Sequence, residues 1–215
     1  MPGNQVVLIH GFAKNSQDML PLQNNLQLLG YQGILINLPL TFKPLEYSVG
    51  LLETVLDDKL SNLAGSEKIH LVGHSTGGLV IRGWLATTKY KDKVDKGVLL
   101  ATPNQGSQLA DMAGRCLPLL PALCKTLASL QSERVKQLPP PTELSVELGA
   151  IAGNNNNLLL GKLLKEENDG RVTVESVRIP GLKDFMTLPF GHQEIHKKLE
   201  TAQLIDRFLQ RGKFR

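Results

Sequence analysis

Short apolar runs alternate with longer amphipathic stretches along this chain of 215 residues. The apolar runs are rich in β-branched residues and predict strands that are buried on both faces of a sheet. These predicted strands cover residues 6–9, 33–37, 68–72, 97–100, 148–152 and 185–188. The stretches between them predict helices over residues 17–29, 49–63 and 78–88, from residue 109 onward, and over 194–209.

This alternation predicts an α/β fold, with a mostly parallel sheet of about six strands flanked by helices on both faces. A chain of this length can bury a substantial core and lies within the range of one domain. We therefore expect a single domain over residues 1–215, and the sequence shows no internal repeat.

Residues 107–142 interrupt the strand–helix alternation. The segment contains the apolar run Leu117-Pro118-Leu119-Leu120-Pro121-Ala122-Leu123, and Leu138-Pro139-Pro140-Pro141-Thr142 predicts a stiff, extended connector back to the sheet. Residues 107–130 have two interpretations, a lid-like helical insertion over an apolar pocket or a pair of helices packed in the core. The run Asn154–Asn157 predicts a polar loop near the carboxyl edge of the sheet.

The formal net charge is +4, and the basic residues are dispersed over two patches that are best interpreted as solvated helix faces. We therefore expect no nucleic-acid partner. No apolar run approaches the roughly 18 residues of a membrane span, so no integral membrane segment is expected. No signal peptide is visible, which favours a cytoplasmic protein, or a secreted one from which a leader was removed. The oligomeric state is left open.

The two cysteines, Cys116 and Cys124, both lie in the 107–130 segment. A disulfide would need their Cα atoms within about 7 Å, which their spacing leaves open, and in the cytoplasm both would be reduced. The chain has no cysteine–histidine cluster with zinc spacing and no phosphate-binding loop of the G-x-x-x-x-G-K-[ST] type. We therefore expect no metal and no cofactor.

The strongest chemical signal is Gly73-His74-Ser75-Thr76-Gly77-Gly78, between a predicted buried strand and a predicted helix. A serine framed by glycines in this setting is typical of a nucleophile elbow, a turn so tight that the serine takes strained backbone angles. The elbow would present the Ser75 hydroxyl clear of the backbone, beside the positive end of the helix. A bare glycine–serine turn is the alternative for the pentapeptide taken alone.

The first predicted strand ends in His10-Gly11-Phe12. Next to a serine nucleophile of this kind, two backbone N–H groups stabilise the developing oxyanion. One belongs to the residue after the serine, here Thr76, and the other to the loop after the first core strand. Gly11 lets that loop pass close to a substrate carbonyl, so the Phe12 N–H is the candidate for the second donor. His10 is interpreted as a residue that orders the loop.

Together these motifs resemble a minimal α/β-hydrolase of the bacterial lipase and esterase superfamily. The resemblance rests on five blocks in family order: His10-Gly11-Phe12, the Ser75 elbow, Leu100-Ala101-Thr102-Pro103-Asn104-Gln105-Gly106-Ser107, Asn168-Asp169-Gly170-Arg171-Val172 and Gly191-His192. It implies that the two leading antiparallel strands of larger relatives are absent, and that a lid often follows the fourth strand.

The resemblance also points to the acid and the base. Asp169 matches the acid of an N-D-G-x-V loop, with Asp184 and Glu175 as alternatives, and His192 matches the base. A histidine just past the last strand can reach over the carboxyl edge of the sheet to the elbow. The other four histidines suit that role less well: His70 lies in a strand, His74 within the elbow, His10 in the oxyanion loop and His196 in the terminal helix pattern.

The expected activity is hydrolysis of carboxylic esters through an acyl-enzyme, with Ser75, His192 and Asp169 as the triad. The substrate would be a small or medium acyl ester, or a lipid ester in peripheral contact with lipid if residues 107–130 form a mobile lid. A thioesterase, amidase or acyltransferase on the same scaffold is one alternative. A catalytically silent binding protein with this fold is another.

Overall fold

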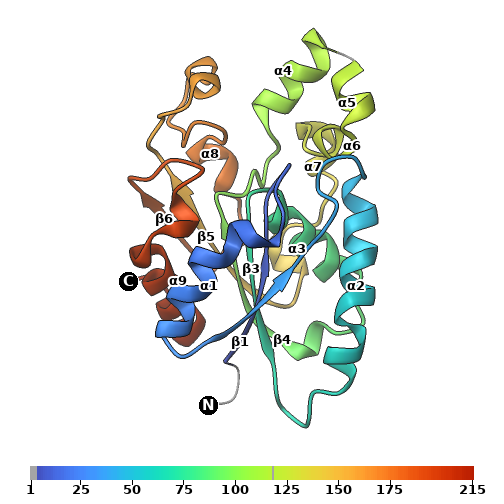
Figure 1. Cartoon of the computed structure of the whole chain (residues 1–215), viewed down its shortest axis with the longest axis vertical. Coiled ribbons are helices and arrows are strands. Elements are labelled where there is room, and N and C mark those ends of the chain that lie inside the picture. Colours follow the sequence, from blue (N-terminus) through green and yellow to red (C-terminus); the bar gives the residue numbers. More distant parts are fainter. Residues whose placement is uncertain (1–3, 118) are drawn as a thin grey trace.

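A computed structural model describes residues 4–117 and 119–215 of the chain. Its sheet is parallel throughout, in the order β2-β1-β3-β4-β5-β6 (Figure 1). The strands are β1 (Gln5–Ile9), β2 (Gln32–Ile36), β3 (Ile69–His74), β4 (Val94–Leu100), β5 (Glu147–Gly153) and β6 (Asp184–Leu188). The predicted fold class and all six predicted strands are confirmed, with shifts of a few residues at the ends.

Alternate residues of the strands face two separate hydrophobic layers. Val6 and Leu8 of β1 pack with α1 (Leu20–Leu28) and α9 (Leu199–Arg211), whereas Val7 and Ile9 pack on the other side of the sheet. That second layer contains α2 (Leu45–Ser61), α3 (Thr76–Thr87) and α8 (Val174–Val177). Because both faces are covered, strands such as β1 and β4 carry consecutive buried apolar residues (Val6–Ile9 and Val98–Leu100), which is why the sequence shows runs rather than alternation.

Three predicted helices have different boundaries in the structure. The segment 17–29 opens as a 3-10 turn over Ser16–Met19 before α1, and α2 starts directly after Pro44, four residues earlier than expected. The terminal segment 194–209 was expected to be one helix, but Ile195–Lys197 form a separate 3-10 turn and α9 begins at Leu199. His196 therefore lies in a tight turn outside α9.

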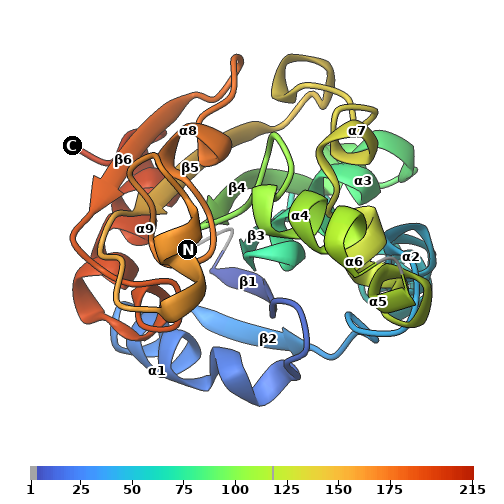
Figure 2. The same ribbon diagram turned by 90° about the horizontal axis from the view of Figure 1, so that it is seen from above.

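The insertion after β4 forms four short helices, α4 (Gln108–Cys116), α5 (Leu119–Leu123), α6 (Lys125–Ser129) and α7 (Ser132–Val135). They lie beyond the carboxyl ends of the strands, and the segment between β5 and α8 rises on the opposite side (Figures 1 and 2). Ala110, Leu130 and Val135 join the core, while Leu119 and Leu123 are exposed. Pro118 lies outside the described residues.

The connector at residues 138–142 is only partly extended. Pro140 has extended backbone angles, but Pro141–Glu143 form a 3-10 turn. Cys116 and Cys124 are free thiols. Within the described part of the chain, no helix combines the length and apolar character that crossing a membrane requires.

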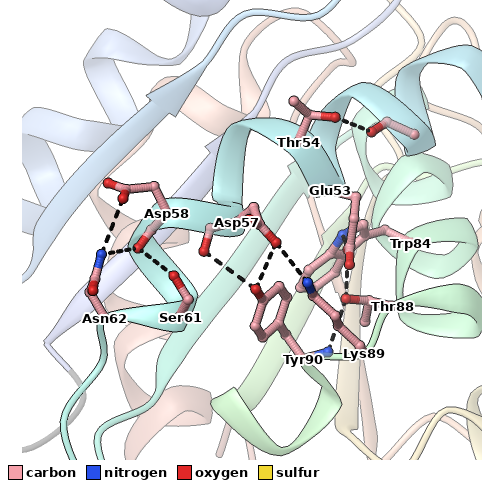
Figure 3. A network of polar contacts seen from close by, with 11 residues as sticks. Glu53, Thr54, Asp57, Asp58, Ser61, Asn62, Trp84, Thr88, Lys89 and Tyr90 are labelled. Atoms are coloured by element: carbon pink, nitrogen blue, oxygen red, sulfur yellow. Dashed lines mark hydrogen bonds and ion pairs between the residues drawn. The ribbon is translucent and has the colours of Figure 1, made fainter.

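A polar seam fastens α3 to α2 (Figure 3). The Glu53 carboxylate accepts hydrogen bonds from Trp84 Nε1 at 2.6 Å and from Thr88 Oγ1 at 2.7 Å. Farther along α2, Asp57 accepts from the Tyr90 hydroxyl and pairs with Lys89 at 2.9 Å. Since α3 begins at the residue after Ser75, this seam holds the helix that follows the predicted nucleophile.

Candidate active site

Ser75 occupies a strained turn between β3 and α3. Its backbone angles are φ 53° and ψ −122°, a region that residues with a side chain rarely adopt, and its N–H donates to the Leu100 carbonyl at 2.8 Å. A Cβ atom on Gly73 would lie 2.5 Å from the backbone of Gly77 and Gly78, so the turn closes only with glycine there. The predicted strand–elbow–helix geometry is present.

His192 joins Ser75 to Asp169. Its Nε2 atom lies 3.1 Å from the Ser75 hydroxyl, and its Nδ1 atom lies 2.7 Å from the Asp169 carboxylate. The His192 N–H also donates to the Asp169 carbonyl at 2.8 Å, which fixes the loop after β6 against the loop that carries the acid. Three residues spread over 118 positions of the chain are thereby brought together in the order serine, histidine, aspartate.

The Asp169 carboxylate is completely buried and fully engaged. Its second oxygen, Oδ1, accepts backbone hydrogen bonds from Arg171 at 2.9 Å and Val172 at 2.8 Å. Gly170, with φ 96°, makes the tight turn that brings these two amides back to the carboxylate. Donors of this kind stabilise the ionised form of a buried carboxylate, which can then orient a histidine.

The alternative acids lie elsewhere. Asp184 opens β6, where its carboxylate accepts from the backbone amides of Phe185 and Phe214. Glu175 is an exposed residue of the short helix α8. The structure therefore brings only Asp169, of the three carboxylates considered, onto the histidine.

The loop after β1 runs directly against the elbow. A Cβ atom on Gly11 would lie 3.0 Å from the Ser75 Cβ, and Phe12 lines the same cavities as Ser75. Thr76 is the first residue of α3, where backbone N–H groups have no acceptor within the helix. Both predicted oxyanion donors therefore belong to residues beside Ser75.

His10 orders this loop, as expected. Its Nε2 atom accepts from the Leu38 N–H at 3.1 Å, which leaves the proton on Nδ1 to donate to the Gly11 carbonyl at 2.9 Å. Burial lowers the pKa of His10 below its ordinary value. The residue is therefore held neutral and in one tautomer.

An apolar cavity of about 350 Å³ opens beside Ser75 and His192. Most of its wall comes from the insertion, with the remainder from the loop after β1 and from the segment between β5 and α8. The lining side chains include Phe12, Leu109, Ala110, Ala113, Leu120, Leu127, Leu130, Leu160 and Val172. The sequence predicted an apolar pocket under the insertion but not which residues line it, because apolar residues are spread over the whole of residues 109–130.

A second group of polar residues, which the sequence did not indicate, packs against His192. The His74 ring lies 4.9 Å from that of His192 and 4.2 Å from that of His196, and His74 Nε2 donates to the His192 carbonyl at 3.0 Å. His196 Nε2 lies 3.4 Å from the Asp18 carboxylate. Burial holds the pKa of His74 well below its usual range, and the contact with His196 lowers that of Asp18. Asp18, His74 and His196 lie far apart in the chain, so no local signal in the sequence could have found this group.

Solved structures resemble this one along nearly the whole chain. Lipase BlEst2 of Bacillus licheniformis in its propeptide form matches with a TM-score of 0.84 and 24% identity, over 96% of this chain and 50% of that one. The chain thus spans half the length of that form. The mature form of the same lipase matches with a TM-score of 0.79 and 24% identity, over 97% of this chain and 91% of that one. A metagenomic carboxyl esterase matches with a TM-score of 0.76 and 16% identity, over 99% and 77%.

At these identities the likeness shows the fold alone. No curated protein sequence matches the chain. The family model described as the alpha/beta hydrolase fold matches residues 4–137, more than half of the chain and including the elbow. The chain belongs to the α/β-hydrolase fold family.

Proposed function

We propose that the protein hydrolyses carboxylic esters, with Ser75 as nucleophile, His192 as general base and Asp169 as the orienting acid. The observation that carries the proposal is the continuous polar chain from the Ser75 hydroxyl through both ring nitrogens of His192 to the buried Asp169 carboxylate. The lipases and the esterase that share the fold support hydrolysis as the reaction class.

The mechanism follows from the tautomer of His192. Because Nδ1 faces a carboxylate, it carries the proton, and Nε2 has the lone pair that accepts the Ser75 proton as Oγ attacks the ester carbonyl. Asp169 then stabilises the imidazolium, and the N–H groups of Phe12 and Thr76 bind the oxyanion. The imidazolium protonates the departing alcohol. Water activated by His192 releases the acid from the acyl-enzyme.

The cavity beside Ser75 favours an acyl group of medium length. Its volume is about 350 Å³, whereas the neighbouring cavity of about 20 Å³ has room for a single water molecule. Apolar side chains make up most of the wall, to which Ser107 and Arg171 also contribute. We therefore propose esters of medium-chain acids as the preferred substrates.

The surroundings of the cavity favour an ester presented at a lipid surface. Leu117, Leu119 and Leu123 of the insertion are 60%, 77% and 70% exposed. Leu159 and Leu163, 78% and 55% exposed, lie on the opposing segment between β5 and α8 (Figure 2). Leucines gathered at such exposures mark an interaction surface, and here the neighbouring Leu120 and Leu160 continue into the cavity. We propose peripheral contact of this leucine rim with lipid.

The test is hydrolysis of p-nitrophenyl esters from acetate to palmitate by the wild type and by Ser75→Ala. We expect a maximum at medium chain length in the wild type and a loss of about 10⁴-fold or more in kcat for the variant. A fluorophosphonate should label the wild type at Ser75 and leave the variant unlabelled. A wild type that neither turns over any ester nor is labelled would contradict the proposal and favour a silent binding protein.

Ester, thioester and amide substrates that carry the same acyl group distinguish ester hydrolysis from thioester and amide hydrolysis. We expect the ester to have the highest kcat/KM, in line with the lipases and the esterase that share the fold. A thioester or amide turned over faster than the ester would overturn ester hydrolysis while leaving the triad assignment intact.

A further inference from the structure

Asp18, His74 and His196 form a compact cluster beneath the proposed triad. One potential metal-ligating atom of each residue lies within 4.8 Å of those of the other two. The residues come from three distant segments: the 3-10 turn before α1, the elbow, and the 3-10 turn before α9. No spacing in the sequence could have indicated this cluster, because zinc motifs are recognised from ligands close together in the chain.

Both histidines of the cluster have nitrogen atoms without a hydrogen-bond partner. The His74 Nε2 proton is donated to the His192 carbonyl, so its buried Nδ1 atom carries a lone pair that no donor reaches. His196 is 1% exposed, and neither of its ring nitrogens has a hydrogen bond. Asp18 Oδ2 is likewise buried without one, although it lies 3.4 Å from His196 Nε2. Such groups normally pair with protein, water or an ion.

The space beside these groups fits one small occupant. Asp18, His74 and His196 line a cavity of about 20 Å³, which is room for a single water molecule or ion. Ser75 and His192 lie on the same cavity. Lys14, whose side chain is half-exposed, approaches the other oxygen of Asp18, Oδ1, at 3.7 Å.

We propose that Asp18, His74 and His196 bind one Zn²⁺ ion. Two imidazoles and a carboxylate are a ligand set that zinc accepts. Ligands that already converge on one cavity need little rearrangement to bind an ion.

Binding there would inhibit the enzyme, and this consequence rests on the proposed function. During acylation His192 becomes an imidazolium, and its ring packs on that of a proposed ligand, His74. A divalent cation on the same cavity disfavours a second positive charge at His192. Zn²⁺ should therefore slow attack by Ser75.

The binding test uses Ser75→Ala, so that it is independent of hydrolytic activity. Zn²⁺ should bind at one equivalent in calorimetry and raise the thermal unfolding temperature. Co²⁺ bound at a site with four or five ligands should absorb visible light more strongly than Co²⁺ free in water. Added Zn²⁺ should displace the Co²⁺ and remove this absorption. Introducing Asp18→Asn or His196→Gln should weaken binding at least about tenfold.

His70→Gln is the matched control, because His70 lies 3.8 Å from the carboxylate of Asp95 but does not belong to the cluster. It should leave zinc affinity unchanged. Asp18 is partly exposed, so Asp18→Asn keeps the test valid if His196→Gln fails to fold. Absence of stoichiometric binding, or binding unaffected by Asp18→Asn, would overturn the site and indicate that the cavity holds water.

The inhibitory consequence is tested separately in the wild type. The rate at which a fluorophosphonate labels Ser75 should fall as the Zn²⁺ concentration rises. The Zn²⁺ concentration that halves this rate should match the dissociation constant found by calorimetry, and Asp18→Asn should relieve the inhibition. Unchanged labelling on a protein saturated with Zn²⁺ would contradict inhibition and leave the site itself standing. Absence of labelling without any metal would instead contradict the proposed function.

Discussion

At the scale of single residues, hydrogen bonds determine which ring nitrogen carries the proton in two histidines near Ser75. His192 and His10 are both buried imidazoles, and in each a neighbour on one nitrogen decides what the other can do. A carboxylate on Nδ1 of His192 leaves Nε2 to accept the Ser75 proton. A backbone N–H on Nε2 of His10 makes that ring a neutral part of the loop. The same type of side chain is therefore the proposed general base at one position and a structural residue at the other.

Asp169→Asn should lower kcat on a medium-chain p-nitrophenyl ester by roughly 10³–10⁴-fold, because the amide can donate to Nδ1 and favour the wrong histidine tautomer. The exposed Glu175 supplies the control, and Glu175→Gln should retain wild-type kcat. Equal losses in the two variants, or full activity in Asp169→Asn, would remove Asp169 from the triad.

His10 predicts a dependence of stability on pH. Its pKa is lowered in the folded state. Below the unfolded value of about 6.5, the unfolded chain therefore binds more protons than the folded one, and the free energy of unfolding decreases as the pH is lowered. This contribution is complete above the unfolded pKa and lost as pH falls through the folded one.

His10→Gln keeps an acceptor for the Leu38 N–H but cannot be protonated. Urea unfolding at several pH values between 4 and 8 (about one unit apart) should show a shallower decline for the variant than for the wild type. Parallel curves for the two proteins would mean that His10 does not contribute to the acid sensitivity.

At the scale of elements, the elbow depends on how closely β3, α3 and β1 approach. A side chain on Gly77 would collide with the carbonyl oxygens of Ile9 and His10, and one on Gly78 with Thr102. The helix that carries the Thr76 amide can therefore sit on the sheet only through glycine contacts. The polar seam around Glu53 holds the far end of the same helix (Figure 3).

Gly73→Ala and Gly50→Ala test this packing. The first places a Cβ 2.5 Å from backbone atoms and should lower the free energy of unfolding by about 3 kcal/mol or more. The second adds a Cβ with no atom within 4 Å on an exposed position of α2, and should be neutral or stabilising by about 0.5–1 kcal/mol. Denaturant unfolding measures both. Similar stabilities would show that the elbow tolerates a wider turn.

At the scale of the whole molecule, the acyl cavity is shared between parts of the chain that are far apart. The insertion, the loop after β1 and the segment before α8 each supply one wall, and they meet only beyond the carboxyl edge of the sheet (Figures 1 and 2). This edge is where ligands bind in open α/β sheets, because the loops that follow the strands converge there.

Ala113→Phe should move the preferred substrate toward shorter esters, because the added ring occupies part of the cavity that Ala113 lines. We expect the kcat/KM for the decanoate ester to fall about tenfold or more while that for the acetate ester stays near the wild-type value. Ala122→Phe, an exposed position of the same insertion, is the control. An unchanged chain-length profile in Ala113→Phe would place the acyl group elsewhere.

Local signals in the sequence were sufficient for the strands, the elbow and the oxyanion loop. A buried strand requires a run of apolar residues, and a turn without room for a Cβ requires glycine at fixed spacing. Both features can therefore be recognised within a few residues of sequence. Helix ends were less certain, since Pro44 before α2 and the 3-10 turn over Ile195–Lys197 depend on caps and packing that the apolar pattern does not record.

The sequence by itself determined the fold class, Ser75 and, by order along the chain, His192 and Asp169 as candidates. Only the tertiary structure brought Asp169, rather than Asp184 or Glu175, to His192, shaped the cavity beside Ser75, and brought Asp18 to His74 and His196. These are contacts between residues tens to hundreds of positions apart. Their geometry depends on how loops meet at one edge of the sheet, and periodicity along the chain carries no information about that meeting.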